Sequence, residues 1–116
     1  MPEATFRHGD PVYMDYTPIG GNVAAGQVVL LGNSAGLACG VAHRDIANNT
    51  PGALAIGEGV YEVTMGTNIA PYTKVYWDDA NNKVSSTSTN NATFGYLLTG
   101  NTGANTLVLA VHRPNA

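Results

Sequence analysis

The stretch IAPYTKVYWDDANNKVSSTS, residues 69–88, is the feature around which we organise the chain. Its middle, from Lys74 to Trp77, is rich in β-branched and aromatic residues and holds the single tryptophan of the chain. The next five residues, DDANN, have side chains that favour turns and tolerate left-handed backbone. A polar, alternating pattern resumes from Lys83 to Thr87, so the stretch predicts a β-hairpin.

Other short runs of β-forming residues lie on both sides of this hairpin, separated by clusters of Gly, Pro and Asn. No segment has convincing helical periodicity, and only Gly66 to Tyr72 leaves room for a short helical turn. We expect strands at residues 11–16, 27–31, 35–42, 53–56, 60–65, 74–77, 83–87, 94–98 and 107–113. The pattern predicts an all-β, small single-domain sandwich or barrel, jelly-roll-like, of roughly nine short strands. In the last strand, Leu107, Leu109 and Val111 are expected on the inner face.

The N-terminal segment differs from the rest of the chain. Residues 1–10 contain Pro2, Gly9 and few apolar side chains. We therefore expect an extended N-terminal arm at residues 1–10, followed by a single β domain at residues 11–116.

The composition excludes several classes of partner. Only 11% of the 116 residues are charged, against roughly 25% in an average soluble domain. The net charge is −3 and the lysines and arginines are scattered singly, so the basic stripe that nucleic-acid binding needs is missing. No apolar run approaches the roughly 20 residues of a membrane span. A neutral, polar surface suits dense packing among copies of the chain or against a partner, because little charge has to be desolvated.

The single cysteine and the N-terminus indicate where the chain is made. Cys39 lies between Ala38 and Gly40 and cannot form an intramolecular disulfide, so we interpret it as a small buried apolar residue. The first ten residues lack the basic and apolar regions of a signal peptide. We expect synthesis in a reducing cytoplasm.

No motif for catalysis or metal binding emerges from the sequence. The three histidines, His8, His43 and His112, fall in different elements, and we expect them at the surface or in turns. Asp78 and Asp79 point to opposite faces of a strand and fit a turn better than a metal site. Neither a nucleophile elbow nor a phosphate-binding loop is present. We therefore expect a protein that is not an enzyme, with no catalytic residues, no metal and no cofactor.

The aromatic residues leave two alternatives open. Tyrosine and tryptophan can form a platform for sugar stacking, or they can fill a core or a subunit interface. We expect Tyr61, Tyr76, Trp77 and also Val108 in the core or in a subunit interface. A carbohydrate-binding or host-surface-binding β-sandwich module is the alternative.

The order of segments resembles a known family. A buried strand bounded by glycine is followed by a strand of small residues, a Pro-Gly turn, two aromatic strands and a final Val/Leu strand. The segments that carry the likeness are GQVVL 26–30, VA 41–42, DIA 45–47, GVYEV 59–63, KVYWD 74–78 and FGYL 94–97. Over nearly everything from Asp10 to Arg113, the chain resembles the phage cement (capsid decoration) proteins.

This resemblance implies a structural protein of the bacteriophage virion, made in the cytoplasm of the host bacterium. Such a protein is a homo-oligomer, dimeric or trimeric, that sits on the outer surface of the capsid and clamps neighbouring capsomers. Its partner would be the major capsid protein, with no nucleic acid or membrane involved. We expect the arm and a loop such as Thr17 to Ala25 to touch the capsid, with the candidates Glu3, Thr5, Phe6, Arg7, His8 and Ile19.

Overall fold

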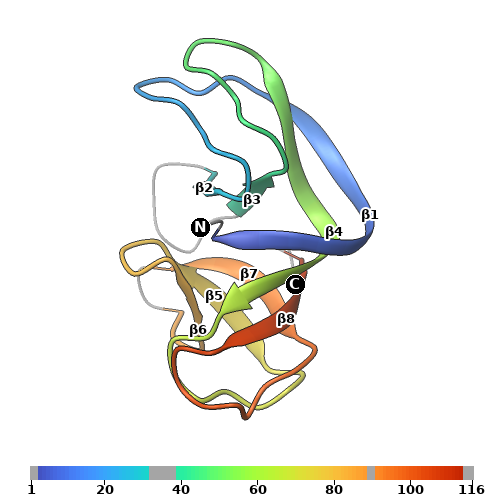
Figure 1. The fold of residues 1–116 in the computed structure, drawn as a ribbon, viewed down its shortest axis with the longest axis vertical. Coiled ribbons are helices and arrows are strands. Elements are labelled where there is room, and N and C mark those ends of the chain that lie inside the picture. Colours follow the sequence, from blue (N-terminus) through green and yellow to red (C-terminus); the bar gives the residue numbers. More distant parts are fainter. Residues whose placement is uncertain (1–2, 32–38, 89–90, 114–116) are drawn as a thin grey trace.

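Eight strands form one antiparallel sheet in the computed structural model, which describes residues 3–31, 39–88 and 91–113 (Figure 1). The strands are β1 Ala4–Tyr16, β2 Val28–Leu30, β3 Cys39–Ala42, β4 Gly52–Thr64, β5 Lys74–Asp78, β6 Lys83–Ser85, β7 Ala92–Leu97 and β8 Leu107–His112. The all-β class is therefore confirmed, with eight strands in place of roughly nine. Residues 66–72 form bends and a turn where a helical turn was considered. Within the described ranges, no helix is long and apolar enough to cross a membrane.

Strand β4 is the central element of the sheet. The strands follow the order β2-β3-β4-β8-β7-β5-β6, and β1 pairs with β4 outside this path. The first half of β4 pairs with β3 and the second half with β8, whereas β1 follows β4 along its length. The segment Gly57-Glu58-Gly59 was expected to separate two strands. It instead bends one strand, because two glycines and the positive φ of Glu58 (70°) change the chain direction without ending the pairing.

The lower part of the molecule, here called the barrel region, contains the second half of β4 and strands β5–β8 (Figure 1). The sheet curls until Met65, after β4, forms a parallel bridge with Val84 of β6. The amide of Gly66 then donates to the carbonyl of Val84 at 2.9 Å. The largest fully buried side chains of this region are Trp77, Tyr61, Phe94, Met65 and Leu97. The hairpin predicted at residues 69–88 is present as β5 and β6 and forms one wall of this core.

The upper part, here called the lobe, contains the second half of β1, strands β2 and β3, and the first half of β4. Its loops are joined by a bridge between Val23 and Ile46. Its core is small and consists of Val23, Val29, Ala42, Ile46 and Leu54, with Met14, Tyr16 and Leu31 packed partly exposed against it. The lobe therefore has no buried aromatic ring in its own cluster.

The N-terminal segment corrects the expectation of an arm. Residues 4–10 form the first half of β1 and pair with β4 from Val63 to Gly59. The chain end is also held to β2: the Ala4 amide donates to the Gly26 carbonyl at 2.9 Å, and the Val28 amide donates to Glu3 Oε1 at 2.8 Å. The pattern gave no strand signal because β1 is exposed on both faces over residues 6–10, so apolar alternation is absent.

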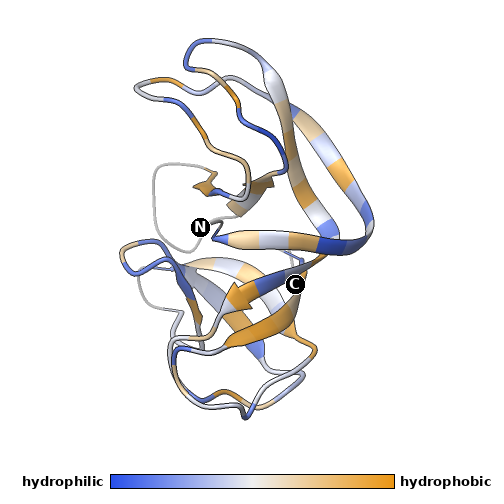
Figure 2. Cartoon of the chain, viewed as in Figure 1, coloured by the Kyte–Doolittle hydropathy of each residue, from blue (hydrophilic) through white to orange (hydrophobic). Residues whose placement is uncertain are grey.

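Strand β8 also differs from its expected orientation. Val108, Ala110 and His112 point into the barrel region, and Leu107 is 52% exposed. The pairing of Ala110 with the buried Tyr61 sets this orientation. Because β8 is apolar along most of its length (Figure 2), alternation could not select the inner face.

Candidate contact site around His43

His43 follows β3 and lies at the centre of an aromatic cluster that joins the lobe to the barrel region. Its ring centroid is 4.6 Å from that of Phe6, 5.4 Å from that of Tyr13 and 5.5 Å from that of Tyr61. Strand β1 supplies Phe6 and Tyr13, and β4 supplies Tyr61. Three segments that are distant in the sequence are therefore held together by ring contacts.

Two hydrogen bonds fix the orientation of the His43 ring. Nδ1 lies 3.1 Å from the hydroxyl of Tyr13, and Nε2 lies 2.6 Å from the hydroxyl of Tyr61. Burial lowers the pKa of His43, which favours the neutral ring with one donor and one acceptor nitrogen. Burial, followed by the proximity of Tyr13 and Cys39, raises the pKa of Tyr61. Both phenol and imidazole are therefore held neutral, and their bonds position the strands.

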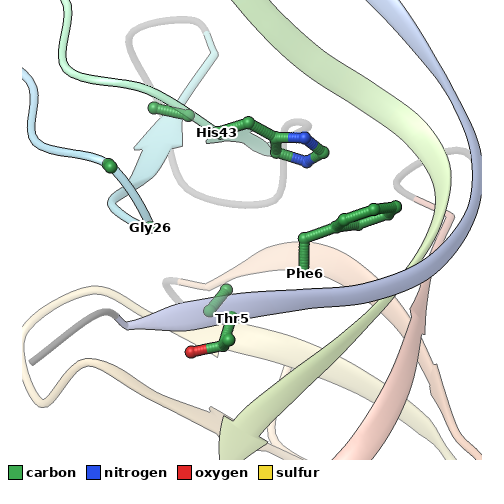
Figure 3. A pocket seen from close by; sticks show the side chains of 7 residues that line it. Thr5, Phe6, Gly26 and His43 are labelled. Atoms are coloured by element: carbon green, nitrogen blue, oxygen red, sulfur yellow. The ribbon is translucent and has the colours of Figure 1, made fainter.

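Two cavities adjoin His43. The first has a volume of about 290 Å³ and is shown in Figure 3, where the rings of Phe6 and His43 lie next to each other in its wall. Its lining consists of Ala4, Thr5, Phe6, Ala25, Gly26, Ala42 and His43. The second has a volume of about 430 Å³ and is lined by Tyr13, His43, Arg44, Asp45, Ile46, Gly52 and Ala53. His43 thus lines both an apolar cavity and a cavity that carries charge.

A second histidine, His112, is not at the surface or in a turn, so the expectation was wrong for this residue. It is fully buried in the barrel region, where its Nε2 bonds to the carbonyl oxygen of Cys39 at 2.7 Å. Its Nδ1 has no hydrogen-bond partner among the described residues. Burial lowers its pKa to about 4, and burial followed by the charge of Asp79 raises the pKa of Cys39 to about 12. The two groups are therefore a neutral imidazole and a thiol, not the thiolate pair of a nucleophile.

The candidate capsid-contact residues fall in two places. On β1, Thr5 is half-buried, Phe6 is 37% exposed, His8 is exposed and Arg7 forms an ion pair with Glu62 at 2.7 Å. Glu3 precedes this strand and holds β2, as described above. Ile19, 86% exposed, lies in the loop that follows the other end of β1. The structure does not bring Ile19 together with the first group.

The candidates for core or subunit interface lie mostly inside. Tyr61 and Trp77 are fully buried and Val108 is 3% exposed, whereas Tyr76 is half-buried with Lys74 Nζ 5.7 Å from its ring centroid. A fully buried indole offers no face to a sugar, so Trp77 cannot serve as a stacking platform in a carbohydrate-binding module.

The acidic pair belongs to the hairpin turn. The indole N–H of Trp77 donates to Asp79 Oδ1 at 3.2 Å, and the side-chain amide of Asn81 donates to Asp78 Oδ2 at 2.8 Å. Over the described parts of the chain, no group of three acidic, His or Cys side chains is placed to hold a metal ion.

Sequence reasoning missed the cluster around His43. His43 was expected at the surface or in a turn, and no spacing pattern links it to Phe6 or Tyr13. Only the pairing of β1 with β4 and of β3 with β4 places these residues side by side. No local signal in the sequence could have shown it.

The fold and this site define a small all-β protein with one curled antiparallel sheet and two cavities beside an aromatic cluster. The chain belongs to the phage cement protein family, whose sequence model matches residues 6–112. No curated protein and no solved structure matches the chain. The family resemblance is thus confirmed, and the chain is a structural protein of the phage virion that associates with the capsid. The structural character of the family is compatible with the expectation that the chain is not an enzyme.

Proposed function

We propose that this chain is a capsid decoration protein that binds the outer surface of the phage head. There it contacts the major capsid protein, acts as a homo-oligomer and stabilises contacts between neighbouring capsomers. The observation that carries the proposal is the placement of exposed apolar side chains. Among the described residues, five of the seven large hydrophobic residues that are exposed lie between residues 3 and 31: Phe6, Val12, Tyr13, Ile19 and Leu30.

The physical role of such a surface is to add buried area between subunits. A protein that binds the assembled shell and not its separated subunits stabilises the shell by mass action, without any chemical step. Burial of apolar surface contributes roughly 25 cal/mol per Å² before the costs of association are subtracted. The low charge of the chain limits the desolvation cost on binding.

The first test uses capsids of the phage that encodes this chain, prepared without it. The purified protein should co-sediment with these capsids and raise the temperature at which they disassemble. Light scattering on the free protein should give the mass of a dimer or trimer. Failure to co-sediment would reject the proposal, and a monomeric mass would reject the homo-oligomer.

Point variants are the appropriate probes of the contact surface. Removal of residues 2–9 would delete half of β1 and disturb the sheet, so it cannot separate binding from folding. Ile19→Ser removes an 86% exposed side chain and should weaken capsid binding while leaving the fold intact. Tyr72→Ser, at a residue that is 76% exposed on the barrel region, is the matched control and should bind as the wild type does.

A further inference from the structure

Arg44 is the basic side chain that forms no ion pair or hydrogen bond with any other residue that the structure describes. The sequence contains five lysines and arginines. Arg7 pairs with Glu62, Arg113 pairs with Glu58 and Lys83 donates to Asn105, and Lys74 also has interactions. Arg44 is exposed and has no ion pair or hydrogen bond among the described residues. Its guanidinium is therefore available to a carboxylate from outside the chain.

The surroundings of Arg44 favour a carboxylate with apolar atoms attached to it. Arg44 lines the 430 Å³ cavity together with the hydroxyl-bearing Tyr13 and the apolar Ile46. The one acidic residue in this lining, Asp45, accepts a hydrogen bond at 2.8 Å from the amide of Ala25, which lies in the loop between β1 and β2. A guanidinium presents parallel N–H groups that match the two oxygens of a carboxylate.

The neighbouring 290 Å³ cavity extends this site, because His43 lines both cavities. It is lined mainly by small apolar residues and by the ring of Phe6, which is 37% exposed (Figure 3). A ligand that fills both cavities therefore needs an acidic group for one and an apolar group for the other. An extended peptide carries such groups on nearby side chains, and its backbone can bond to polar groups along a groove.

We propose that the two cavities around His43 take an extended acidic segment of the capsid protein, with a carboxylate on Arg44 and an apolar side chain beside Phe6. This inference rests on the proposed function and names the chemistry of its partner. It assigns to Arg44 the role of anchor, while His43 and its hydrogen bonds to Tyr13 and Tyr61 hold the walls of the groove in place.

The first experiment measures binding isotherms to undecorated capsids for the wild type, Arg44→Gln and Arg113→Gln. Arg113 is the matched control, because its side chain is 48% exposed, it loses the same charge and it lies outside the groove. Loss of a charged hydrogen bond should weaken binding by Arg44→Gln roughly tenfold, and Arg113→Gln should stay within about twofold of the wild type. Both variants should melt within a few degrees of the wild type, because both changes are at exposed side chains.

The outcomes separate the two proposals. Capsid binding by Arg44→Gln equal to that of the wild type would overturn the groove and leave the decoration function standing. A wild type that does not bind capsids would overturn both.

A second experiment identifies the occupant. Overlapping peptides that cover the capsid protein are tested by fluorescence anisotropy against the wild type and Arg44→Gln. An acidic peptide should bind the wild type and lose most of its affinity with Arg44→Gln, or when its Asp and Glu residues are replaced by Asn and Gln. Binding of acidic glycans in place of any peptide, lost in Arg44→Gln, would overturn the peptide as occupant.

Discussion

The barrel region and the lobe share strand β4 but are stabilised to different degrees. The barrel region buries three large aromatic side chains, Trp77, Tyr61 and Phe94, each of which removes roughly 150–250 Å² from water. The lobe core consists of aliphatic residues, each worth roughly 1.5–3 kcal/mol on full burial, and its larger side chains Met14 and Tyr16 are partly exposed. One half of the sheet therefore holds the larger buried core, while the other half leaves more of its apolar side chains exposed.

The largest effect is expected from Gly95→Ala, which would break the barrel region. Gly95 has a φ of 154°, and an added Cβ would overlap the carbonyl oxygen of Val111 and lie 2.7 Å from the Arg113 amide. Because backbone atoms on the neighbouring strand cannot move aside, we expect a loss of about 4 kcal/mol or more in the free energy of unfolding. Urea denaturation measures it.

The control for this variant lies in the lobe. Gly21→Ala places its Cβ where no atom lies within 4 Å, and it should change the free energy of unfolding by less than about 0.5 kcal/mol. Similar losses for the two variants would show that close packing at Gly95 is not the cause.

A matched pair of leucines compares the two cores directly. Leu97 of the barrel region and Leu54 of the lobe are both fully buried. Leu-to-Ala changes in cores cost about 2–5 kcal/mol, and the cost rises with the cavity that remains. We expect Leu97→Ala near the upper end and Leu54→Ala near the lower end, since partly exposed neighbours in the lobe can move into the space. A larger loss for Leu54→Ala, measured by chemical denaturation, would reverse the comparison.

His112 makes the barrel region sensitive to acid. Burial lowers its folded-state pKa from 6.5 to about 4, so the unfolded chain takes up a proton before the folded chain does as the pH falls. The contribution of neutral His112 to the free energy of unfolding is therefore complete above pH 6.5. It is lost as the pH falls from 6.5 towards 4, and the loss is about 3 kcal/mol at most. Between pH 7 and pH 4, the free energy of unfolding should fall more steeply with decreasing pH for the wild type than for His112→Gln. Denaturation curves recorded at several pH values measure both slopes. Parallel pH profiles would refute the assignment.

The smallest effect is expected at the strand that joins the two regions. Arg7→Gln removes an ion pair whose side chains are 48% and 29% exposed, and solvent screens such pairs. We expect a loss of about 0.2–1 kcal/mol that shrinks as salt is added. Thermal melts at low and high salt test this. A loss that is larger and independent of salt would mean that Arg7 supports the first half of β1 through packing.

The sequence predicted best where a local signal coincided with the tertiary environment. The hairpin was found because Asp and Asn residues mark its turn, and Asn82 indeed has a φ of 56°. The burial of Cys39 also follows from its small neighbours. The first half of β1 was missed because neither of its faces is buried over residues 6–10, so no periodicity exists to be detected.

The site was less predictable than the fold. Phe6 and Ile19 were chosen through the family resemblance, and they lie at opposite ends of β1. His43 was expected at the surface or in a turn and Arg44 was not singled out, because their neighbours in space come from distant parts of the chain. His112 was expected outside, since a polar residue in an apolar strand does not reveal which face it occupies.

The sequence by itself determined the all-β class, the hairpin at its centre and the membership of the cement family, because these depend on local propensity, turn residues and the order of segments. The three-dimensional structure was needed to show that β4 continues through Gly57-Glu58-Gly59, that His112 lies inside and that Arg44 lines a cavity next to His43. The physical reason is that strand pairing joins residues far apart in the chain. Which face, edge or neighbour a residue receives depends on the register of those pairs, and local sequence carries little of that information.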